Sequence, residues 1–278
     1  MNFDMNHAWT RGVELIRENF QLLVVIAGVF LLLPSIAAYM FVPDFALLAD
    51  PTADPDILAA QMADGAVPIF GVSFMSMLAQ FAGYGAMIAL MGPARPTVGE
   101  AIGVGFKVML STIAVFFIFM AVYMISATLI FLPIALLGSL LGPGAFLLFA
   151  LAFLPILFGV VYLMARMSMS MPVLVLGGTL NPISAVMRSF KLTHKQQWSI
   201  LLFWTVLFVG YFIIAMLFSG GFAVIAAAAG GGTVSGLILG LTNGILGMGI
   251  GMLVCAIAVA VYGQLAGPTE EEVTSVFE

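Results

Sequence analysis

Six long apolar runs, separated by shorter polar segments, dominate the pattern of hydrophobic and polar positions along the chain. A helix that crosses the roughly 30 Å hydrocarbon core of a bilayer needs about 20 predominantly apolar residues. The pattern therefore predicts an all-α polytopic integral membrane protein with six transmembrane helices. We expect them near residues 20–41, 67–91, 108–131, 145–164, 198–218 and 235–265. Residues 132–141 form either a short extra turn or a helix extension, and the fourth helix extends toward the break before Pro172.

A short amphipathic stretch precedes each pair of apolar runs, and the three stretches align without gaps. They share an N-cap residue type, then an alanine, a small residue and a charged residue at equal spacings. The aligned residues are Asp4, Thr97 and Asn181; Ala8, Ala101 and Ala185; Gly12, Gly105 and Ser189; and Glu14, Lys107 and Lys191. We interpret the chain as one membrane domain, 1–278, with repeats at 4–92, 97–166 and 181–266, each an interfacial helix followed by a two-helix hairpin. Because every repeat begins on the same side of the membrane, the repeats are parallel.

The third stretch has the clearest amphipathic pattern. Its apolar and polar faces are formed, respectively, by Ile183, Val186, Met187 and Phe190 and by Ser184, Arg188, Lys191 and Lys195. A helix of this kind lies in the headgroup region with its cations toward anionic lipid. We therefore expect a cytoplasmic collar of three short helices.

The basic residues indicate how the chain is threaded through the membrane. All eight lie before the first apolar run, between the second and third, or between the fourth and fifth: Arg11, Arg17, Arg95, Lys107, Arg166, Arg188, Lys191 and Lys195. Short cytoplasmic loops retain Lys and Arg. We therefore expect a polytopic membrane protein with both termini in the cytoplasm, including an acidic tail at 267–278. The N-terminus lacks the layout of a cleaved export signal, so the first run is expected to stay in the protein.

Composition supports lipid as the main solvent, since 63% of residues are hydrophobic and 8% are charged. The net charge of −5 reflects acids in one external loop and in the tail, and no basic nucleic-acid face is present. Cys255 lies inside the last run and has no disulfide partner. Met164, Met167, Met169 and Met171 are interpreted as packing residues rather than a copper site. We predict no catalytic, cofactor-binding or metal-binding residue, His7 and His194 included.

Polar and glycine residues inside the apolar runs allow two interpretations each. Ser73, Ser76, Gln80, Tyr84 and Asn243 are candidates for lining a cavity, but hydrogen bonding between helices is the more economical interpretation. Small residues recur at helical spacing in the sixth run, where they predict close helix packing: Gly236, Gly240, Gly244, Gly247 and Gly251. Packing within the chain is favoured over packing against a second copy.

The segment 166–195 resembles part of a known membrane domain. The residues that carry this resemblance are Arg166, Pro172, Ala185, Ser189 and Leu192, with an apolar, strand-like run after the proline. The similar domain stands beside the catalytic domain of some bacterial glycerophosphoryl diester phosphodiesterases and also occurs alone. Residues 95–107 look like a degenerate copy of the same element. The resemblance implies the six-span layout but no catalysis, because the phosphodiesterase activity of the fused relatives belongs to a separate soluble barrel for which this chain has no room.

Two functional hypotheses follow from these features. The first is a non-enzymatic protein of the bacterial inner membrane, the location that the resemblance implies. It acts as a scaffold or a lipid- and amphiphile-binding module, with membrane lipids and either a protein partner or a second copy as its partners. Arg166, Arg188, Lys191 and Lys195 are then the candidates for headgroup contact, although determining topology alone would also explain them. The alternative is a transporter or flippase for a lipid-like or peptide substrate. The central parts of the runs lack ionisable residues, which counts against proton coupling.

Overall fold

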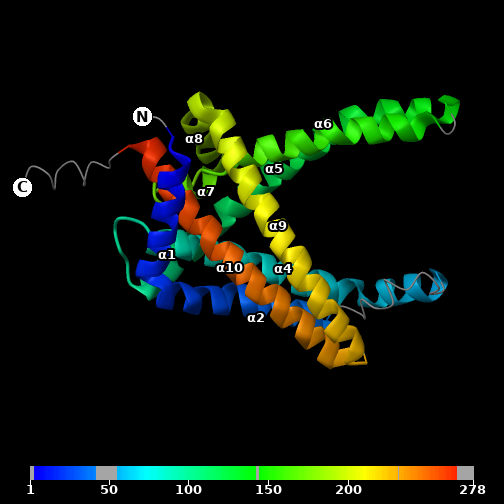
Figure 1. The fold of residues 1–278 in the computed structure, drawn as a ribbon, viewed down its shortest axis with the longest axis horizontal. Coiled ribbons are helices and arrows are strands. Elements are labelled where there is room, and N and C mark those ends of the chain that lie inside the picture. The colour runs from blue at the N-terminus through cyan, green and yellow to red at the C-terminus, as the bar shows by residue number, and fades with distance from the viewer. Residues whose placement is uncertain (1–2, 42–54, 142–143, 231, 268–278) are drawn as a thin grey trace, which may run out of the picture. The chain divides into compact units, whose positions relative to one another are not determined.

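The computed structural model describes residues 3–41, 55–141, 144–230 and 232–267, and within these ranges it contains helices and no β-strand (Figure 1). The prediction of an all-α protein is therefore confirmed. The elements in chain order are α1 (Met5–Ala27), the π-helix η1 (Gly28–Leu32), α2 (Leu33–Phe41), α4 (Pro55–Leu90), α5 (Val98–Leu141), α6 (Gly144–Met167), α7 (Ser170–Val175), α8 (Pro182–Thr193), the 3₁₀-helix η2 (His194–Gln196), α9 (Gln197–Ala228) and α10 (Gly232–Ala266).

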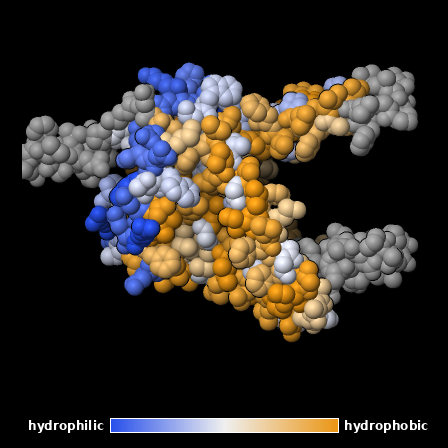
Figure 2. Space-filling model, viewed as in Figure 1, coloured by the Kyte–Doolittle hydropathy of each residue, from blue (hydrophilic) through white to orange (hydrophobic). Residues whose placement is uncertain are grey.

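Six helices of the described chain are long and apolar enough to cross a membrane. Their large apolar side chains face outward, as α5 illustrates: Phe117, Ile125 and Leu129 are 58%, 61% and 70% exposed. Hydrophobic residues likewise cover α6, whereas hydrophilic residues gather over α8 (Figure 2). Water does not tolerate apolar surface of this extent, so these faces require lipid. The chain is a multi-pass membrane protein with six candidate spans.

Several helix boundaries differ from those predicted. The second helix begins at Pro55 rather than near 67, and the third continues through Pro133 to Leu141, so 132–141 is an extension. The predicted strand-like run after Pro172 is wrong, because Ser170–Val175 is a short helix. Hydropathy indicates which part of a helix lies in the hydrocarbon core. The helix itself extends as far as backbone hydrogen bonds continue, so its ends can lie beyond the apolar run. The acidic tail falls almost wholly outside the described residues. So do the side chains of the predicted external loop between the first two spans, which holds Asp44, Asp50, Asp54, Asp56 and Asp64.

The amphipathic stretches connect to their spans in two ways. The first and second run into the following span without a break in helical residues, although the helix changes direction between α1 and α2 (Figure 1). A π-helical segment such as η1 is a common site of helix bending. The third stretch is separate, because the 3₁₀ turn at His194–Gln196 divides α8 from α9. Of the three amphipathic stretches, α8 is therefore the one that forms a separate short helix.

The described residues group into two compact units. One unit contains residues from 6–109 and 207–260. Part of its interior is formed by the glycine stripe of α10, that is, Gly236, Gly240, Gly244, Gly247 and Gly251. A Cβ built on Gly240 would lie 2.9 Å from the Ile36 Cα, and one on Gly244 would lie 2.5 Å from Leu32 Cδ1. Gly236 faces the carbonyl oxygen of Tyr39 in the same way. These three glycines therefore pack against η1 and α2 of the same chain.

One glycine of the stripe has different surroundings. A Cβ on Gly247 would meet no heavy atom within 4 Å, whereas one on Gly251 would lie 2.5 Å from Leu31 Cδ2. Periodicity specifies the direction in which a residue points, but contact also needs an atom of the neighbouring helix at that height. The described structure shows no neighbour at Gly247, so its part in helix packing stays a prediction.

The other unit draws on 1–5, 110–206 and 261–278, and it joins the start of α1 to the end of α10. The Asp4 amide donates a hydrogen bond to Gln264 Oε1 at 3.0 Å, and Gln264 Nε2 donates to the Asp4 carbonyl oxygen at 3.2 Å. Next to this pair, the Phe3 amide donates to Gln196 Oε1, and the Phe3 ring packs edge-on against Phe203. The beginning of the first span and the end of the last one therefore lie side by side.

Candidate functional site

The separate helix α8 begins at a well-formed cap. Asn181 has an extended backbone, and its Oδ1 accepts hydrogen bonds from the amides of Ile183 (3.0 Å) and Ser184 (3.2 Å). Pro182 occupies the first helical position, where its missing N–H costs nothing and its fixed φ suits a helix. These two residues explain why a new helix starts here, and both signals were readable in the sequence.

Helix α8 has a buried stripe of small residues that its amphipathic pattern did not predict. Ala185, Ser189 and Thr193, spaced four residues apart, are each fully buried. The predicted apolar residues Ile183 and Met187 are instead 62% and 57% exposed. Small side chains allow close approach of two helices, so α8 docks through the stripe and leaves Ile183 and Met187 free to contact lipid.

Arg166, at the end of α6, lies beneath this stripe and is only 6% exposed. Its Nη1 donates to Thr193 Oγ1 at 2.8 Å, and its carbonyl oxygen accepts from Ser189 Oγ at 2.6 Å. The ring of Phe190 lies 4.7 Å from Cζ, which is a cation–π contact. Arg166 therefore belongs to a buried joint between α6 and α8 rather than to the exposed cations with which the sequence grouped it. Thr193 was not singled out beforehand, although its four-residue spacing from Ser189 was a signal, and Phe190 was predicted only as part of the apolar face.

The other three candidate headgroup residues, Arg188, Lys191 and Lys195, are exposed. None of their side chains takes part in an ion pair or a hydrogen bond with a described residue. The sequence also contains no Asp or Glu between Glu100 and Glu270. Helix α8 and the following 3₁₀ turn η2 thus present three exposed cations that form no ion pair with a described residue.

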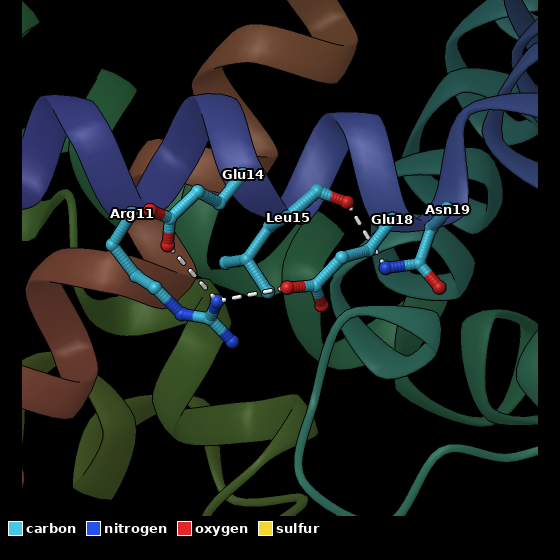
Figure 3. Close-up of polar contacts among 5 residues, drawn as sticks. All are labelled: Arg11, Glu14, Leu15, Glu18 and Asn19. Carbon is cyan, nitrogen blue, oxygen red and sulfur yellow. Dashed lines mark hydrogen bonds and ion pairs between the residues drawn. The ribbon is translucent and has the colours of Figure 1, made fainter.

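The amphipathic part of α1 differs in its charge. Arg11 Nη1 contacts Glu14 Oε2 at 3.3 Å and Glu18 Oε1 at 3.1 Å, and both acids reach it from later turns of the same helix (Figure 3). In the same view Asn19 Nδ2 donates to the Leu15 carbonyl oxygen at 3.0 Å. Arg11 is therefore already paired by its own helix. The third stretch differs in that it gathers three exposed cations, Arg188, Lys191 and Lys195, whereas Arg17 of the first stretch and Lys107 of the second are single exposed cations.

The three aligned small residues occupy similar joints. Gly12 of α1 packs on α10, since a Cβ there would lie 3.0 Å from Ile257 Cγ1, and a Cβ on Gly105 of α5 would collide with the Ala82 carbonyl oxygen of α4. Ser189 of α8 donates to the Arg166 carbonyl oxygen of α6. Each amphipathic stretch therefore contacts the second span of a hairpin. The aligned alanines Ala8, Ala101 and Ala185 are all fully buried.

The candidate cavity-lining residues do not meet at one site in the described contacts. Ser76 Oγ donates to the Pro34 carbonyl oxygen at 3.3 Å, and Ser219 Oγ donates to Asn243 Oδ1 at 3.3 Å. These bonds join neighbouring helices and favour the packing interpretation of Ser76 and Asn243. Ser73 is exposed, and Gln80 and Tyr84 are partly buried.

No cluster of three or more His, Cys, Asp or Glu residues able to hold a metal ion occurs in the part of the chain that the structure describes. His7 and His194 are both exposed. Of the four methionines considered for copper, Met169 is fully buried and Met164 is 41% exposed. No family model matches the chain, and no curated protein or solved structure was found to be similar to it.

Proposed function

We propose that this chain is a non-enzymatic protein of the bacterial inner membrane that binds anionic lipid headgroups through α8. The observation that carries the proposal is the exposure of Arg188 and Lys191 on α8 and of Lys195 on η2. Two large apolar residues of α8, Ile183 and Met187, are also exposed. Such a helix places its apolar side chains among acyl chains and its cations at the phosphate level. Each cation near an anionic surface contributes about 1 kcal/mol.

The side of the membrane on which α8 lies is proposed to be the cytoplasmic side and to hold both termini. The distribution of basic residues supports this orientation. The hydrogen-bonded pair Asp4 and Gln264 supports a common side for the two ends, because the residues that precede α1 and end α10 are in direct contact.

Three parallel repeats are likewise part of the proposal. Their support is that Gly12, Gly105 and Ser189 each lie in a joint with the second span of a hairpin. The proposed relationship to the stand-alone phosphodiesterase-type membrane domains is supported by the positions of its motif residues: Arg166, Pro172, Ala185 and Ser189 are all buried in or beside the α6–α8 joint.

The test is neutralisation of the three cations. The variant R188Q/K191Q/K195Q, purified from membranes of mixed phosphatidylethanolamine and phosphatidylglycerol, is expected to retain less phosphatidylglycerol than the wild type by mass spectrometry. Three contacts of about 1 kcal/mol each correspond to roughly a hundredfold weaker preference at most.

A matched control removes the same charge elsewhere. Arg17, Arg95 and Lys107 are exposed and lie on the same predicted side, outside α8. The variant R17Q/R95Q/K107Q is expected to keep the lipid preference of the wild type. Equal losses in the two variants would indicate a general charge effect, and no loss in the α8 variant would refute headgroup binding by this helix.

A further inference from the structure

Arg166 has more hydrogen-bond donors than the described residues satisfy. A guanidinium carries five N–H donors and stays protonated in proteins. Nη1 bonds to Thr193, but the buried Nε has no partner. No carboxylate of a described residue lies within ion-pairing distance. Burying a charge without a counter-charge is costly, so this arrangement lacks an anionic acceptor.

The joint itself does not need a charge, as the equivalent joint between α4 and α5 demonstrates. Ala82 precedes Thr97 by as many residues as Arg166 precedes Asn181, and Gly105 corresponds in the same way to Ser189. There a glycine packs directly on the Ala82 carbonyl. A joint at the same register is thus made by an alanine and a glycine, without a side-chain hydrogen bond or a charge, and the guanidinium at Arg166 requires another explanation.

A second polar group with an unmet hydrogen bond lies in the same segment. Ser170 is 1% exposed, and its Oγ has no partner, whereas the hydroxyl of nearby Ser168 donates to the Ala165 carbonyl oxygen at 2.7 Å. A guanidinium and a hydroxyl both donate hydrogen bonds to oxyanions, and arginine suits phosphate through its forked geometry.

We propose that Arg166 and Ser170 form a binding site for a phosphate group, occupied when α8 moves away from the end of α6. Both ends of α8 permit such a movement. Gly178, with φ +65° and open space around its Cβ position, precedes it, and the single 3₁₀ turn His194–Gln196 follows it. The phosphate of a lipid headgroup and free phosphate share the chemistry that this site recognises. The site is distinct from the exposed cations of α8 and does not depend on them.

The experiment measures binding of inorganic phosphate to the full chain in detergent micelles, by calorimetry and by Tm, against chloride at equal ionic strength. Phosphate is expected to bind and to raise the Tm. Loss of a charge-assisted hydrogen bond predicts at least about tenfold weaker binding for Arg166→Gln. Ser170→Ala is expected to bind about threefold to tenfold more weakly, with a phosphate-free Tm equal to or above that of the wild type because the unmet hydroxyl is gone.

Ser168→Ala is the matched control and is expected to bind phosphate as the wild type does. R188Q/K191Q/K195Q should also keep its affinity for inorganic phosphate, which separates this site from the surface of α8. Short-chain phosphatidic acid identifies the source: tighter binding than inorganic phosphate assigns a lipid headgroup, and equal or weaker binding assigns free phosphate. The proposal is overturned if the wild type binds phosphate no better than chloride, or if Ser170→Ala binds phosphate as well as Ser168→Ala does.

Discussion

Asp4 and Gln264 exchange two hydrogen bonds, one from the Asp4 amide to the Gln264 side chain at 3.0 Å and one from that side chain back to the Asp4 carbonyl oxygen at 3.2 Å. The pair joins residues at opposite ends of the described chain. Because residues in direct contact lie on one side of the membrane, the start of the first span and the end of the last span lie on the same side. An even number of crossings satisfies this condition, in agreement with the six candidate spans.

The orientation predicted from the basic residues can be tested by cysteine labelling in intact cells. Cys255 is buried in α10 and is replaced first by alanine. A cysteine at Asp54 or Gly231, two positions outside the described residues, is expected to react with an impermeant maleimide, whereas one at Lys191 should react only after the cells are opened. Labelling of Lys191→Cys in intact cells would reverse the assignment of sides.

The bond between Ser189 and the Arg166 carbonyl oxygen should stabilise the docking of α8. Ser189→Ala removes the donor and leaves a buried carbonyl oxygen without it, so we expect a loss of about 1–2 kcal/mol in the free energy of unfolding. Ser184, on the exposed face of α8, provides the control, and Ser184→Ala should change stability by less than about 0.5 kcal/mol. Unfolding in detergent micelles measures both, and equal effects would remove the specific role of Ser189.

Gly105 lies where α5 meets the backbone of α4, and a backbone carbonyl cannot give way as a flexible side chain can. Gly105→Ala is therefore expected to destabilise the protein by about 1–3 kcal/mol. Gly103, on the same helix, has open space around its Cβ position, and Gly103→Ala should be neutral or stabilising by up to about 1 kcal/mol. The comparison uses thermal unfolding of the purified variants. A Gly105→Ala protein as stable as the wild type would contradict the close contact between Gly105 and the Ala82 carbonyl oxygen.

The glycine stripe of α10 gives a second matched pair. Gly240→Ala would place a methyl group 2.9 Å from the Ile36 Cα and should reduce stability by about 1–3 kcal/mol. Gly247→Ala meets nothing within 4 Å and is expected to be tolerated. Should the Gly247 variant instead abolish self-association of the purified protein, that position would belong to an interface between two copies.

Much of the fold could be read from the sequence, because the bilayer imposes a simple rule on composition. Apolar length identified the spans, the cap residue and proline identified the start of α8, and the spacing of glycines identified the packed face of α10. Helix ends were less predictable. Pro55–Leu90 begins well before its apolar run, and Val98–Leu141 passes through a proline, since helical hydrogen bonding does not stop where hydropathy falls.

The candidate site could be predicted only in part. The sequence marked Arg166, Arg188, Lys191 and Lys195 as one group of cations, because positive charge near a span has the same pattern whether it is exposed or buried. Tertiary structure separated them: α8 docks through Ala185, Ser189 and Thr193, which buries Arg166 and leaves the other three exposed.

Local chemistry therefore determined the membrane class, the number of spans and the existence of α8 as a helix, since each depends on residues close together in the chain. Tertiary structure alone decided which residues of α8 are buried, what Arg166 contacts, and that Asp4 meets Gln264. These depend on which distant segment arrives at a given surface. Hydropathy and periodicity carry no information about that choice, because lipid and a neighbouring apolar helix are nearly equivalent surroundings for an apolar side chain.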